Sequence, residues 1–319
     1  MEAPTRRRAP EYAPVEHLAE LRAIAHAEVG KAVIGHDHAV ELMLVAAISG
    51  GHVLIEGPPG TAKTLLAWSM ARVLGVPFRR VQFTPDTTPT EIIGRIVVRG
   101  GEQVFEPGAI FTNVLLADEV NRTPPRTQAA LLEAMQEGRV TVAGESHFLR
   151  RPFLVLATQN PFEFDGIYPL PESQLDRFLF KVTLEYGDEA EELRMLDLPH
   201  RGVAPDVIGD VSPLLGDKRF LLVQETVDAT TVPEPVARYL VGIVRETRSI
   251  SGVVLGASPR AAIHLFSAAK ANARLSGRDF VTADDVALMA PHVLRHRLIV
   301  DGVSADEVVA TAFAAVPRP

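Results

Sequence analysis

The stretch "HVLIEGPPGTAKTLLAWSMARVLG" (residues 52–75) decides the fold that we expect for this chain. It begins with a short apolar run bounded by glycines, as is typical of a buried parallel strand. A loop rich in glycine and proline follows, and the residues after Lys63 show a helical pattern that stops at Gly75. A strand, such a loop and a helix in this order indicate a phosphate-binding loop.

The loop "GPPGTAKT" (57–64) carries the residue types that phosphate binding needs. Consecutive backbone N–H groups and the N-terminus of the following helix point at the phosphate oxygens. Gly57 and Gly60 stand where the backbone must approach the phosphates or adopt open dihedral angles. Lys63 is expected to reach the β- and γ-phosphates, and the Thr64 hydroxyl to bind Mg²⁺. The other loop residues predicted to contact the nucleotide are Pro58, Pro59, Thr61, Ala62 and Leu65.

Ala62 stands before the lysine, where glycine is usual in this loop. We expect the position to require close approach of the backbone rather than an unusual dihedral angle, so that one methyl group is tolerated. Taken alone, the imperfect motif is as compatible with a Gly/Pro turn beside a stray lysine as with a nucleotide site. Its place between a strand and a helix favours the nucleotide site.

Two further apolar runs end in polar residues suited to nucleotide hydrolysis. The run "VLLADE" ends in Asp118 and Glu119, and ligands of open parallel sheets bind at the carboxyl ends of the strands. Asp118 is expected to hold Mg²⁺, and Glu119 to orient and deprotonate the attacking water. Asn160 follows the run "FLVLATQN" and could hold the same water, although a turn residue before Pro161 is the simpler interpretation of Asn160 alone.

Two arginines could supply the positive charge that phosphoryl transfer needs. Arg177 lies in "LDRF", and Arg260 lies in "SPRA" at the start of a predicted helix. For either arginine taken singly, a surface salt bridge is the simpler interpretation.

The pattern along the chain predicts two domains. Strands and helices alternate over 17–187, which indicates an α/β domain whose parallel sheet is covered by helices on both faces. Two hairpins are expected within it, one turning at "GG" in "RIVVRGGEQVF" and one near Gly144. Apart from "RFLLVQ", residues 188–319 show helical patterns and predict a smaller all-α domain. Residues 1–16, rich in proline and arginine, are interpreted as a flexible tail.

Composition narrows the class of protein. The 319 residues are 47% hydrophobic and 23% charged, which is typical of a globular protein. Cysteine is absent, which excludes disulfides and thiolate sites and is compatible with a cytoplasmic location. The net charge of -8 argues against a broad nucleic-acid-binding surface. Glu41 and His52 interrupt the longest apolar stretch, so no membrane span is expected, and the N-terminus does not resemble a secretory signal.

Three tempting features favour structural interpretations. The run "HDH" (36–38) lacks further ligands at the spacing of a metal site. The run "HVLRHRL" (292–298) is interpreted as a solvated helix end, where cations interact favourably with the helix dipole. Trp68 is expected to pack against the sheet.

Taken in order, "GPPGTAKT", "LLADE", "ATQNP", "LDRF" and "GASPRA" resemble the motifs of AAA+ ATPases. Within that superfamily, "VLLADEVNRTPPRTQAALLEAMQEG" and "ATQNPFEFDGIYPLPESQLDRF" are similar to the MoxR family, in which alanine before the lysine is usual. The resemblance runs from about residue 17 to near the C-terminus. It implies a P-loop AAA+ core, a helical lid and the hydrolysis of ATP.

The resemblance also implies roles for individual residues. Ile34 and Gly35 in "VIGHD" would contact the adenine, Asn160 would be the sensor 1 residue and Arg260 the sensor 2 residue. Arg177 would be an arginine finger that reaches the nucleotide of a neighbouring subunit, which requires a ring, usually a hexamer. The segment 86–112 matches the helix 2 insert of the AAA+ clade to which this family belongs. It lies within the predicted α/β domain 17–187.

Three functions are compatible with these motifs. The resemblance implies a Mg²⁺-dependent, ring-shaped, chaperone-like ATPase that remodels protein complexes or assists cofactor or metal insertion, with a client that could be a separate von Willebrand factor A-domain protein. A nucleic-acid motor is the alternative, but the insert 86–112 is slightly acidic, so no nucleic-acid partner is expected. A nucleotide-gated scaffold is disfavoured because Lys63 and Glu119 are both present.

Overall fold

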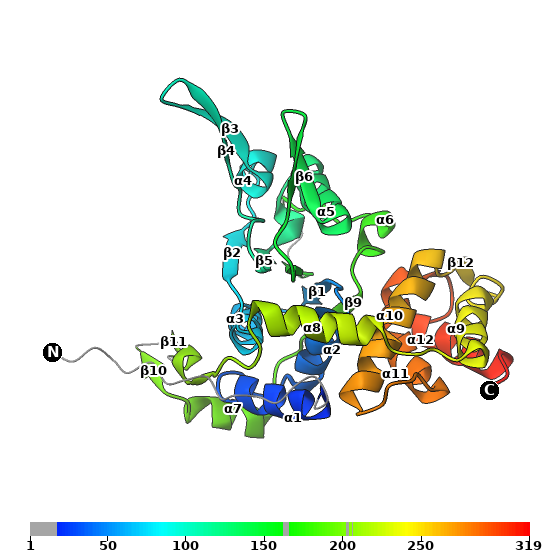
Figure 1. Cartoon of the computed structure of the whole chain (residues 1–319). Coiled ribbons are helices and arrows are strands. Elements are labelled where there is room, and N and C mark those ends of the chain that lie inside the picture. Colours follow the sequence, from blue (N-terminus) through cyan, green and yellow to red (C-terminus); the bar gives the residue numbers. More distant parts are fainter. Residues whose placement is uncertain (1–17, 162–165, 202–203, 206) are drawn as a thin grey trace.

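The computed structural model of the protein describes residues 18–161, 166–201, 204–205 and 207–319 (Figure 1). The predicted tail, residues 1–16, lies outside the described part. Within these ranges, no helix combines the length and the apolar character needed to cross a membrane. The described residues also contain no group of three or more His, Asp or Glu side chains placed to hold a metal ion.

Five parallel strands form the central sheet, in the order β2-β5-β8-β1-β9. Their bounds are Val53–Glu56 for β1, Phe78–Gln82 for β2, Val114–Asp118 for β5, Leu154–Gln159 for β8 and Phe180–Thr183 for β9. Because all five run in the same direction, their carboxyl ends lie along one edge of the sheet. The predicted strands that carry Glu56, Asp118 and Gln159 at their ends are therefore neighbours at that edge.

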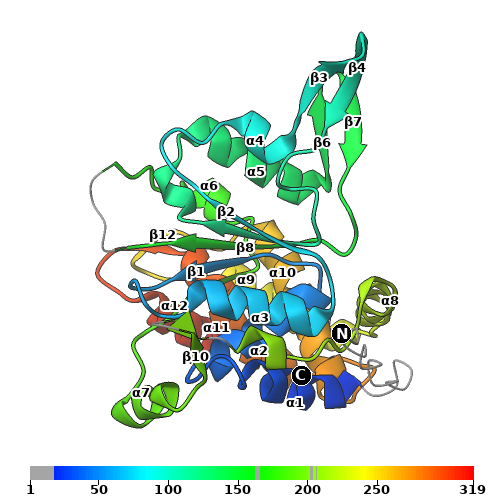
Figure 2. The ribbon, with the colours of Figure 1, turned by 90° about the vertical axis from the view of Figure 1, so that its left-hand side faces the viewer.

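Helices cover both faces of this sheet, which confirms the predicted α/β fold (Figure 2). One face is covered by α1 (Leu18–Val29), α2 (Asp37–Ile48) and α3 (Lys63–Leu74), and the other by α4 (Pro89–Ile93) and α5 (Pro125–Glu137). Alternate residues of β1 enter two different cores, since Val53 and Ile55 belong to the cluster with α2 and α3 whereas Leu54 belongs to the cluster with α5. This is the two-residue period of a strand that is buried on both faces.

Both predicted hairpins are present, and they project from the side of α4 and α5 (Figure 1). The first joins β3 (Arg95–Arg99) to β4 (Glu102–Glu106), and the second joins β6 (Arg139–Val142) to β7 (Glu145–Phe148). They contact each other where the rings of Phe105 and His147 stack with their centroids 3.7 Å apart.

The C-terminal part is mainly helical. Its helices are α8 (Asp217–Asp228), α9 (Glu234–Glu246), α10 (Pro259–Leu275), α11 (Ala283–Leu294) and α12 (Ala305–Ala315), and β12 (Val253–Leu255) pairs with β13 (Ile299–Val300). The segments before it are α6 (Glu172–Leu175), α7 (Glu189–Leu196), β10 (His200–Arg201) and β11 (Ala204–Pro205). The run "RFLLVQ", the exception in the helical pattern, lies inside α8, where Phe220 and Val223 are buried at helical spacing. The short β12–β13 pair was not predicted.

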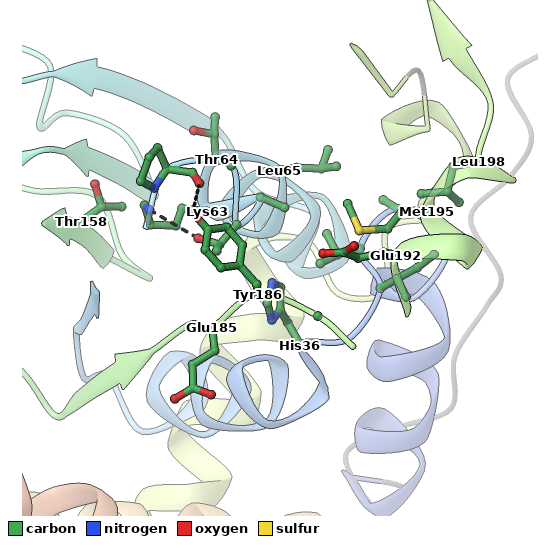
Figure 3. Close-up of a pocket in the computed structure, with 18 of the residues that line it drawn as sticks. His36, Lys63, Thr64, Leu65, Thr158, Glu185, Tyr186, Glu192, Met195 and Leu198 are labelled. Carbon is green, nitrogen blue, oxygen red and sulfur yellow. Dashed lines mark hydrogen bonds between the residues drawn. The ribbon is translucent and has the colours of Figure 1, made fainter. Parts of the chain in front are cut away.

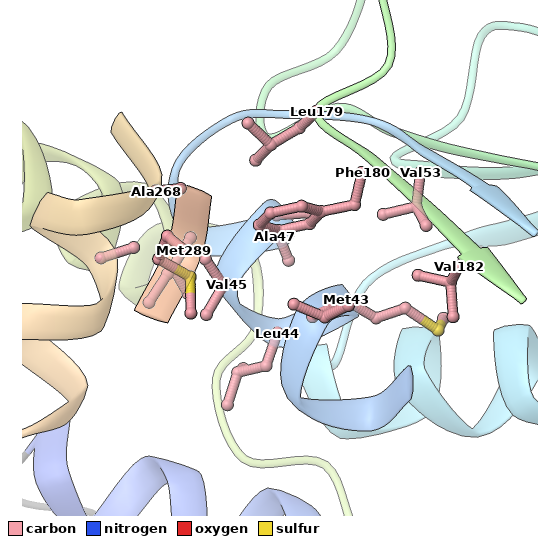
Figure 4. Close-up of a cluster of buried hydrophobic side chains, with 14 of the residues drawn as sticks. Met43, Leu44, Val45, Ala47, Val53, Leu179, Phe180, Val182, Ala268 and Met289 are labelled. Atoms are coloured by element: carbon pink, nitrogen blue, oxygen red, sulfur yellow. The ribbon is translucent and has the colours of Figure 1, made fainter. Parts of the chain in front are cut away.

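One apolar cluster joins these helices to the sheet (Figure 4). In this cluster, α2 contributes side chains to both sides: Val45 lies on the side of Ala268 in α10 and Met289 in α11, whereas Met43 lies near Val182 of β9. The C-terminal helices are therefore packed against the sheet through α2 and, in the case of α11, also directly against β9. The boundary near residue 188 stays a prediction.

Two expectations about single features need correction or refinement. The "HVLRHRL" segment is not a solvated helix end, because Arg297 is 6% exposed and its neighbour His296 contacts the carbonyl oxygen of Phe178. Trp68 of α3 stacks on Phe78 of the edge strand β2, with ring centroids 6.3 Å apart, but remains 44% exposed. It therefore contacts the sheet only at its edge.

Candidate active site

The phosphate-binding loop connects β1 to α3, as its sequence predicts. A Cβ atom added at Gly57 would lie 2.7 Å from the carbonyl oxygen of Leu184, so a side chain is excluded there by close approach of another segment. Gly60 has φ of +86°, a left-handed conformation that glycine adopts without steric cost. Glycine is therefore required at the two positions for different reasons: lack of space at Gly57 and the backbone conformation at Gly60.

Ala62 differs from our expectation. It has φ of 55° and ψ of 21°, which is the left-handed region, and it is the residue immediately before the first residue of α3. The prediction that this position needs no unusual dihedral angle is wrong. An alanine in this conformation costs about 1–2 kcal/mol relative to the right-handed form, and such strain is often found at functional sites.

Lys63 is folded back onto its own loop. Its ammonium group donates to the carbonyl oxygens of Gly57 and Pro58, at 2.8 and 2.7 Å. Burial lowers the pKa of Lys63, while the negative charges of Asp118 and Glu119 act in the opposite direction. The ammonium group thus has neutral partners, which charged phosphate oxygens would displace because charge-assisted hydrogen bonds are stronger.

Asp118, the last residue of β5, is fixed by its two neighbouring strands. Its Oδ2 accepts from the guanidinium group of Arg80 on β2 at 2.7 Å, and its Oδ1 accepts from the hydroxyl of Thr158 on β8 at 2.5 Å. The side chain is largely buried. Its carboxylate oxygens therefore have fixed positions at the carboxyl edge of the sheet.

Glu119 is held in a strained conformation beside it. Its φ is 57°, and its backbone N–H donates to the Thr158 hydroxyl at 2.9 Å. Its carboxylate accepts from the Gln82 amide at 2.7 Å and pairs with Arg122 at 3.1 Å. The hydroxyl of Thr158 therefore positions both acidic residues, one through the side chain and one through the backbone.

These groups line one pocket of about 720 Å³ (Figure 3). Lys63 and Thr158 lie at one end of the pocket, and Met195 and Leu198 lie at the other. The second end is mostly apolar and receives side chains from the segment before α2 and from α7 and the residues around it. A cavity of this size with one charged end and one apolar end suits a ligand that carries phosphates at one end and a flat base at the other.

Most of the residues predicted to contact the nucleotide line this pocket. They are Ile34, Pro59, Gly60, Thr61, Ala62, Lys63, Thr64, Leu65, Asp118, Glu119 and Asn160. Gly35, Gly57 and Pro58 are not among its lining residues. Gly57 and Pro58 nevertheless contribute the carbonyl oxygens that hold the Lys63 side chain.

Arg177 and Arg260 do not line the pocket. Both lie at a junction between the α6–β9 segment and the C-terminal helices, where Arg260 is 3.8 Å from the carboxylate of Asp176. The Ser258 hydroxyl donates to the same carboxylate at 3.0 Å, and Arg297 donates to it at 2.8 Å. We call this cluster, with Asp176, Ser258, Arg260, His264 and Arg297, the junction.

Sequence reasoning missed several residues that line the pocket or hold its acidic side chains. Thr158, Gln82 and Arg80 lie on strands beside the two acidic residues, and the parallel register itself is the signal that could have identified them. The apolar residues Met195 and Leu196 belong to α7, a short and highly charged helix whose pattern is that of a surface element.

The chain is similar to known proteins along most of its length. The family model described as "ATPase family associated with various cellular activities (AAA)" matches residues 52–180, and the AAA lid domain model matches residues 245–316. A crystal structure of a protein from Cytophaga hutchinsonii superposes with a TM-score of 0.86 at 35% identity, covering 96% of this chain and 97% of that one.

Three relatives are similar over almost the whole chain. YeaC from Bacillus subtilis is 40% identical over 93% of this chain and 94% of its own length. Chaperone MoxR1 from Mycobacterium tuberculosis is 44% identical over 88% of this chain and 76% of its own length. Protein MoxR from Methylorubrum extorquens is 30% identical over 92% of this chain and 93% of its own length. On this similarity, and with the fold and pocket described above, the chain belongs to the MoxR family of AAA+ ATPases.

Proposed function

We propose that the protein is a Mg²⁺-dependent ATPase that acts as a ring-shaped chaperone on other proteins. The observation that carries the proposal is the pocket itself, in which Lys63, Asp118, Glu119 and Asn160 come together at the end opposite to an apolar wall. In this proposal the triphosphate lies against Lys63 and the loop N–H groups, and the adenine lies near Ile34.

Glu119 acts as the general base. Its carboxylate accepts a proton from the attacking water as the water oxygen bonds to the γ-phosphorus, while the bond between the γ-phosphorus and the β–γ bridging oxygen breaks and ADP leaves. Asn160 follows β8 at the same edge of the sheet and orients that water through its side-chain amide. Lys63 leaves its carbonyl partners and donates to the β- and γ-phosphate oxygens, where it stabilises the charge that develops during transfer.

The donor set of the pocket fits Mg²⁺. Thr64 supplies a hydroxyl and Asp118 a carboxylate, and both line the same pocket. Magnesium is usually bound by one or two protein oxygens together with phosphate oxygens and water. When bound, it would neutralise charge on the β- and γ-phosphate oxygens. Asp118 is already oriented for this role by the Thr158 hydroxyl.

The rest of the proposal concerns assembly. Neither Arg177 nor Arg260 lines the pocket of its own subunit, which supports a role for Arg177 at the nucleotide of a neighbouring subunit. In this proposal the subunits form a ring of six in the cytoplasm. We assign residues 17–187 to the ATPase core, with 86–112 as a helix 2 insert, and 188–319 to the lid. The relative named Chaperone MoxR1 supports a client protein, for which we suggest a von Willebrand factor A-domain protein.

The test is the variant Glu119→Gln, which keeps the size of the side chain but removes the base. We expect it to bind ATP with unchanged affinity and to lose at least about 99% of hydrolysis, since a general base contributes about 10²–10⁴-fold. An ATP-loaded Glu119→Gln protein should also retain its client in a pull-down. Wild-type turnover in this variant would contradict the assignment of Glu119.

A further inference from the structure

Arg177 lies in the segment that leads from α6 into β9. Its own side chain has no ion pair in the described part of the chain, and its Nε is buried without a hydrogen-bond partner there. The residues on both sides of it are held firmly, with Asp176 in the junction and Phe178 fully buried. An arginine whose backbone is fixed and whose guanidinium group lacks a partner is suited to meet a group outside its own subunit.

Arg297 is the residue that holds this segment. It comes from the short helix after α11, and its side chain is only 2% exposed. Its guanidinium group donates to Asp176 Oδ1 at 2.8 Å, to the Asp176 carbonyl oxygen at 3.2 Å, and to the carbonyl oxygens of Phe178 and Leu179. Arg297 therefore contacts the backbone immediately before and immediately after Arg177.

The same guanidinium group is tied to the lid helices. It donates to the carbonyl oxygen of Val293 in α11 and contacts His264 Nδ1 in α10. The hydroxyl of Ser258, which caps α10, also donates to Asp176. A displacement of α10 or α11 would consequently move the backbone that carries Arg177.

Position 297 requires an arginine for a geometric reason. The planar guanidinium group presents five donors in fixed directions, and here they reach a carboxylate and several carbonyl oxygens at once. A lysine would keep the charge and pair with Asp176, but its three donors come from a single atom and could not hold both sides of Arg177.

We propose that Arg297 is a positioning residue for Arg177, through which the lid of one subunit sets the arginine that acts on the nucleotide of the next subunit. This inference rests on the proposed role of Arg177 in a ring. The inference adds Arg297 to the residues that this role requires. Arg297 does not line the pocket of its own subunit, and it is not proposed to contact the nucleotide of the neighbouring subunit. The lid and the neighbouring active site are then mechanically linked through the segment 176–179.

The test uses Arg297→Lys and mixed rings. The variant should assemble like the wild type and keep its KM for ATP within about twofold, because its own pocket is intact, while kcat falls at least about tenfold from misplacement of Arg177. Lys63→Ala subunits hydrolyse no ATP but supply a well-placed Arg177. Mixed one to one with them, Arg297→Lys subunits should recover at least about threefold in turnover, because half of their sites gain a competent neighbour.

Two mixtures separate the inference from the function on which it rests. Arg177→Ala mixed with Lys63→Ala should also recover, whereas Arg177→Ala mixed with Arg297→Lys should not, since neither subunit supplies a placed arginine. If the first mixture recovers but Arg297→Lys with Lys63→Ala does not, the positioning role is overturned and the proposed ATPase stands. If the first mixture fails, the action of Arg177 between subunits is overturned, and the inference with it.

A second variant guards against a folding defect in Arg297→Lys. Asp176→Asn keeps the shape of the side chain that Arg297 holds but removes its charge, and we expect the same loss of kcat and the same recovery with Lys63→Ala. The exposed pair of Arg238 and Glu234 provides the matched control, because Arg238→Lys changes the same residue type away from the junction. Wild-type turnover in both Arg297→Lys and Asp176→Asn would overturn the inference.

Discussion

The pocket and the junction both concentrate charge, but they satisfy it in different ways. In the pocket, Lys63 is bound to neutral carbonyl oxygens of its own loop, and Glu119 is held by partly exposed side chains. At the junction, Arg297 is almost fully buried and pairs with Asp176. A charged ligand can displace the partners in the pocket, whereas removal of a junction partner leaves a buried group without compensation.

Backbone strain follows the same division. Of the three non-glycine residues with positive φ in the described part of the chain, Ala62 and Glu119 line the pocket, Ala143 lies in the turn between β6 and β7, and none lies in the junction. Strained residues persist only where surrounding structure holds them, and they are concentrated at sites of chemistry. The comparison suggests that the pocket exchanges partners during the ATPase cycle while the junction transmits movement as a fixed contact.

The largest expected effects come from replacing one cationic side chain in each region. In the pocket the change should affect ATP affinity, and at the junction it should affect the free energy of unfolding. Lys63→Met should lower ATP affinity by about 100-fold or more, because a charge-assisted bond to phosphate is lost, and leave stability nearly unchanged. Arg297→Met should lower the free energy of unfolding by about 3 kcal/mol, because Asp176 loses its buried partner, and leave ATP affinity nearly unchanged. Nucleotide titration and urea denaturation measure the two quantities.

Arg238→Met is the control for this pair. Arg238 forms an exposed ion pair with Glu234, at a spacing of four residues in α9. Its loss should cost less than about 0.5 kcal/mol. If Arg297→Met were as stable as Arg238→Met, the junction would not differ from a surface salt bridge.

Acid should weaken the junction through the imidazoles of His264 and of His296, which also contacts Arg297. Burial and then the charge of Arg297 lower the pKa of His264 to about 3 and the pKa of His296 well below 6.5. Both stay neutral in the folded protein, while the unfolded chain takes up protons below pH 6.5. Their contribution is therefore complete above pH 6.5 and is lost as the pH falls, by up to about 1.4 kcal/mol per pH unit for each imidazole.

Urea denaturation between pH 6.5 and 5 measures this loss. His264→Asn keeps an acceptor for Arg297 near the position of Nδ1 but cannot titrate. The slope of unfolding free energy against pH should then decrease by up to about 1.4 kcal/mol per pH unit. An unchanged slope would show that His264 does not contribute to the acid sensitivity.

Gln82→Ala should have a smaller effect, on ATP turnover, because Gln82 contacts a catalytic residue of the pocket. The amide of Gln82 donates to Glu119 Oε2 at 2.7 Å and so holds the carboxylate away from other partners. A hydrogen bond of this kind contributes about 0.5–1.5 kcal/mol, so we expect basal ATP turnover to rise by about threefold when it is removed. Gln103→Ala on the exposed strand β4 is the control. A fall in turnover would mean that Gln82 orients Glu119 for catalysis.

The sequence predicted the pocket better than the junction, for a physical reason. Asp118, Glu119 and Asn160 each follow an apolar strand, and parallel strands bring their carboxyl ends to one edge without further information. Arg297 contacts a partner 121 residues earlier in the chain, so its burial depends on how the lid packs. Its local pattern, rich in Arg and His, resembles a solvated helix end and led to the wrong expectation.

The backbone of the loop also escaped sequence reasoning. The spacing of "GPPGTAKT" indicates the site, but the dihedral angle of one residue depends on how the loop closes onto α3, and Ala62 proved to be left-handed. The apolar wall at Met195 and Leu196 was missed because α7 is mainly charged. Patterns of several residues were informative, whereas single conformations and long-range contacts were not.

Ala62→Gly should have the smallest effect and tests the strain in the pocket directly. Glycine removes the steric cost of the left-handed conformation, but it also loses more backbone entropy on folding. The net gain in stability should be positive and below about 1 kcal/mol. In contrast, Ala129→Gly, at an exposed right-handed position in α5, should lose about 1 kcal/mol.

Urea denaturation of the two glycine variants gives the sign of each change. Opposite signs mean that Ala62 is held in a strained conformation by the surrounding loop and that the strain is local to the pocket. A loss of stability in both variants would show that Ala62 carries no such strain. ATP affinity should stay within about twofold in Ala62→Gly, because the phosphate-binding N–H groups and the Lys63 side chain are unchanged.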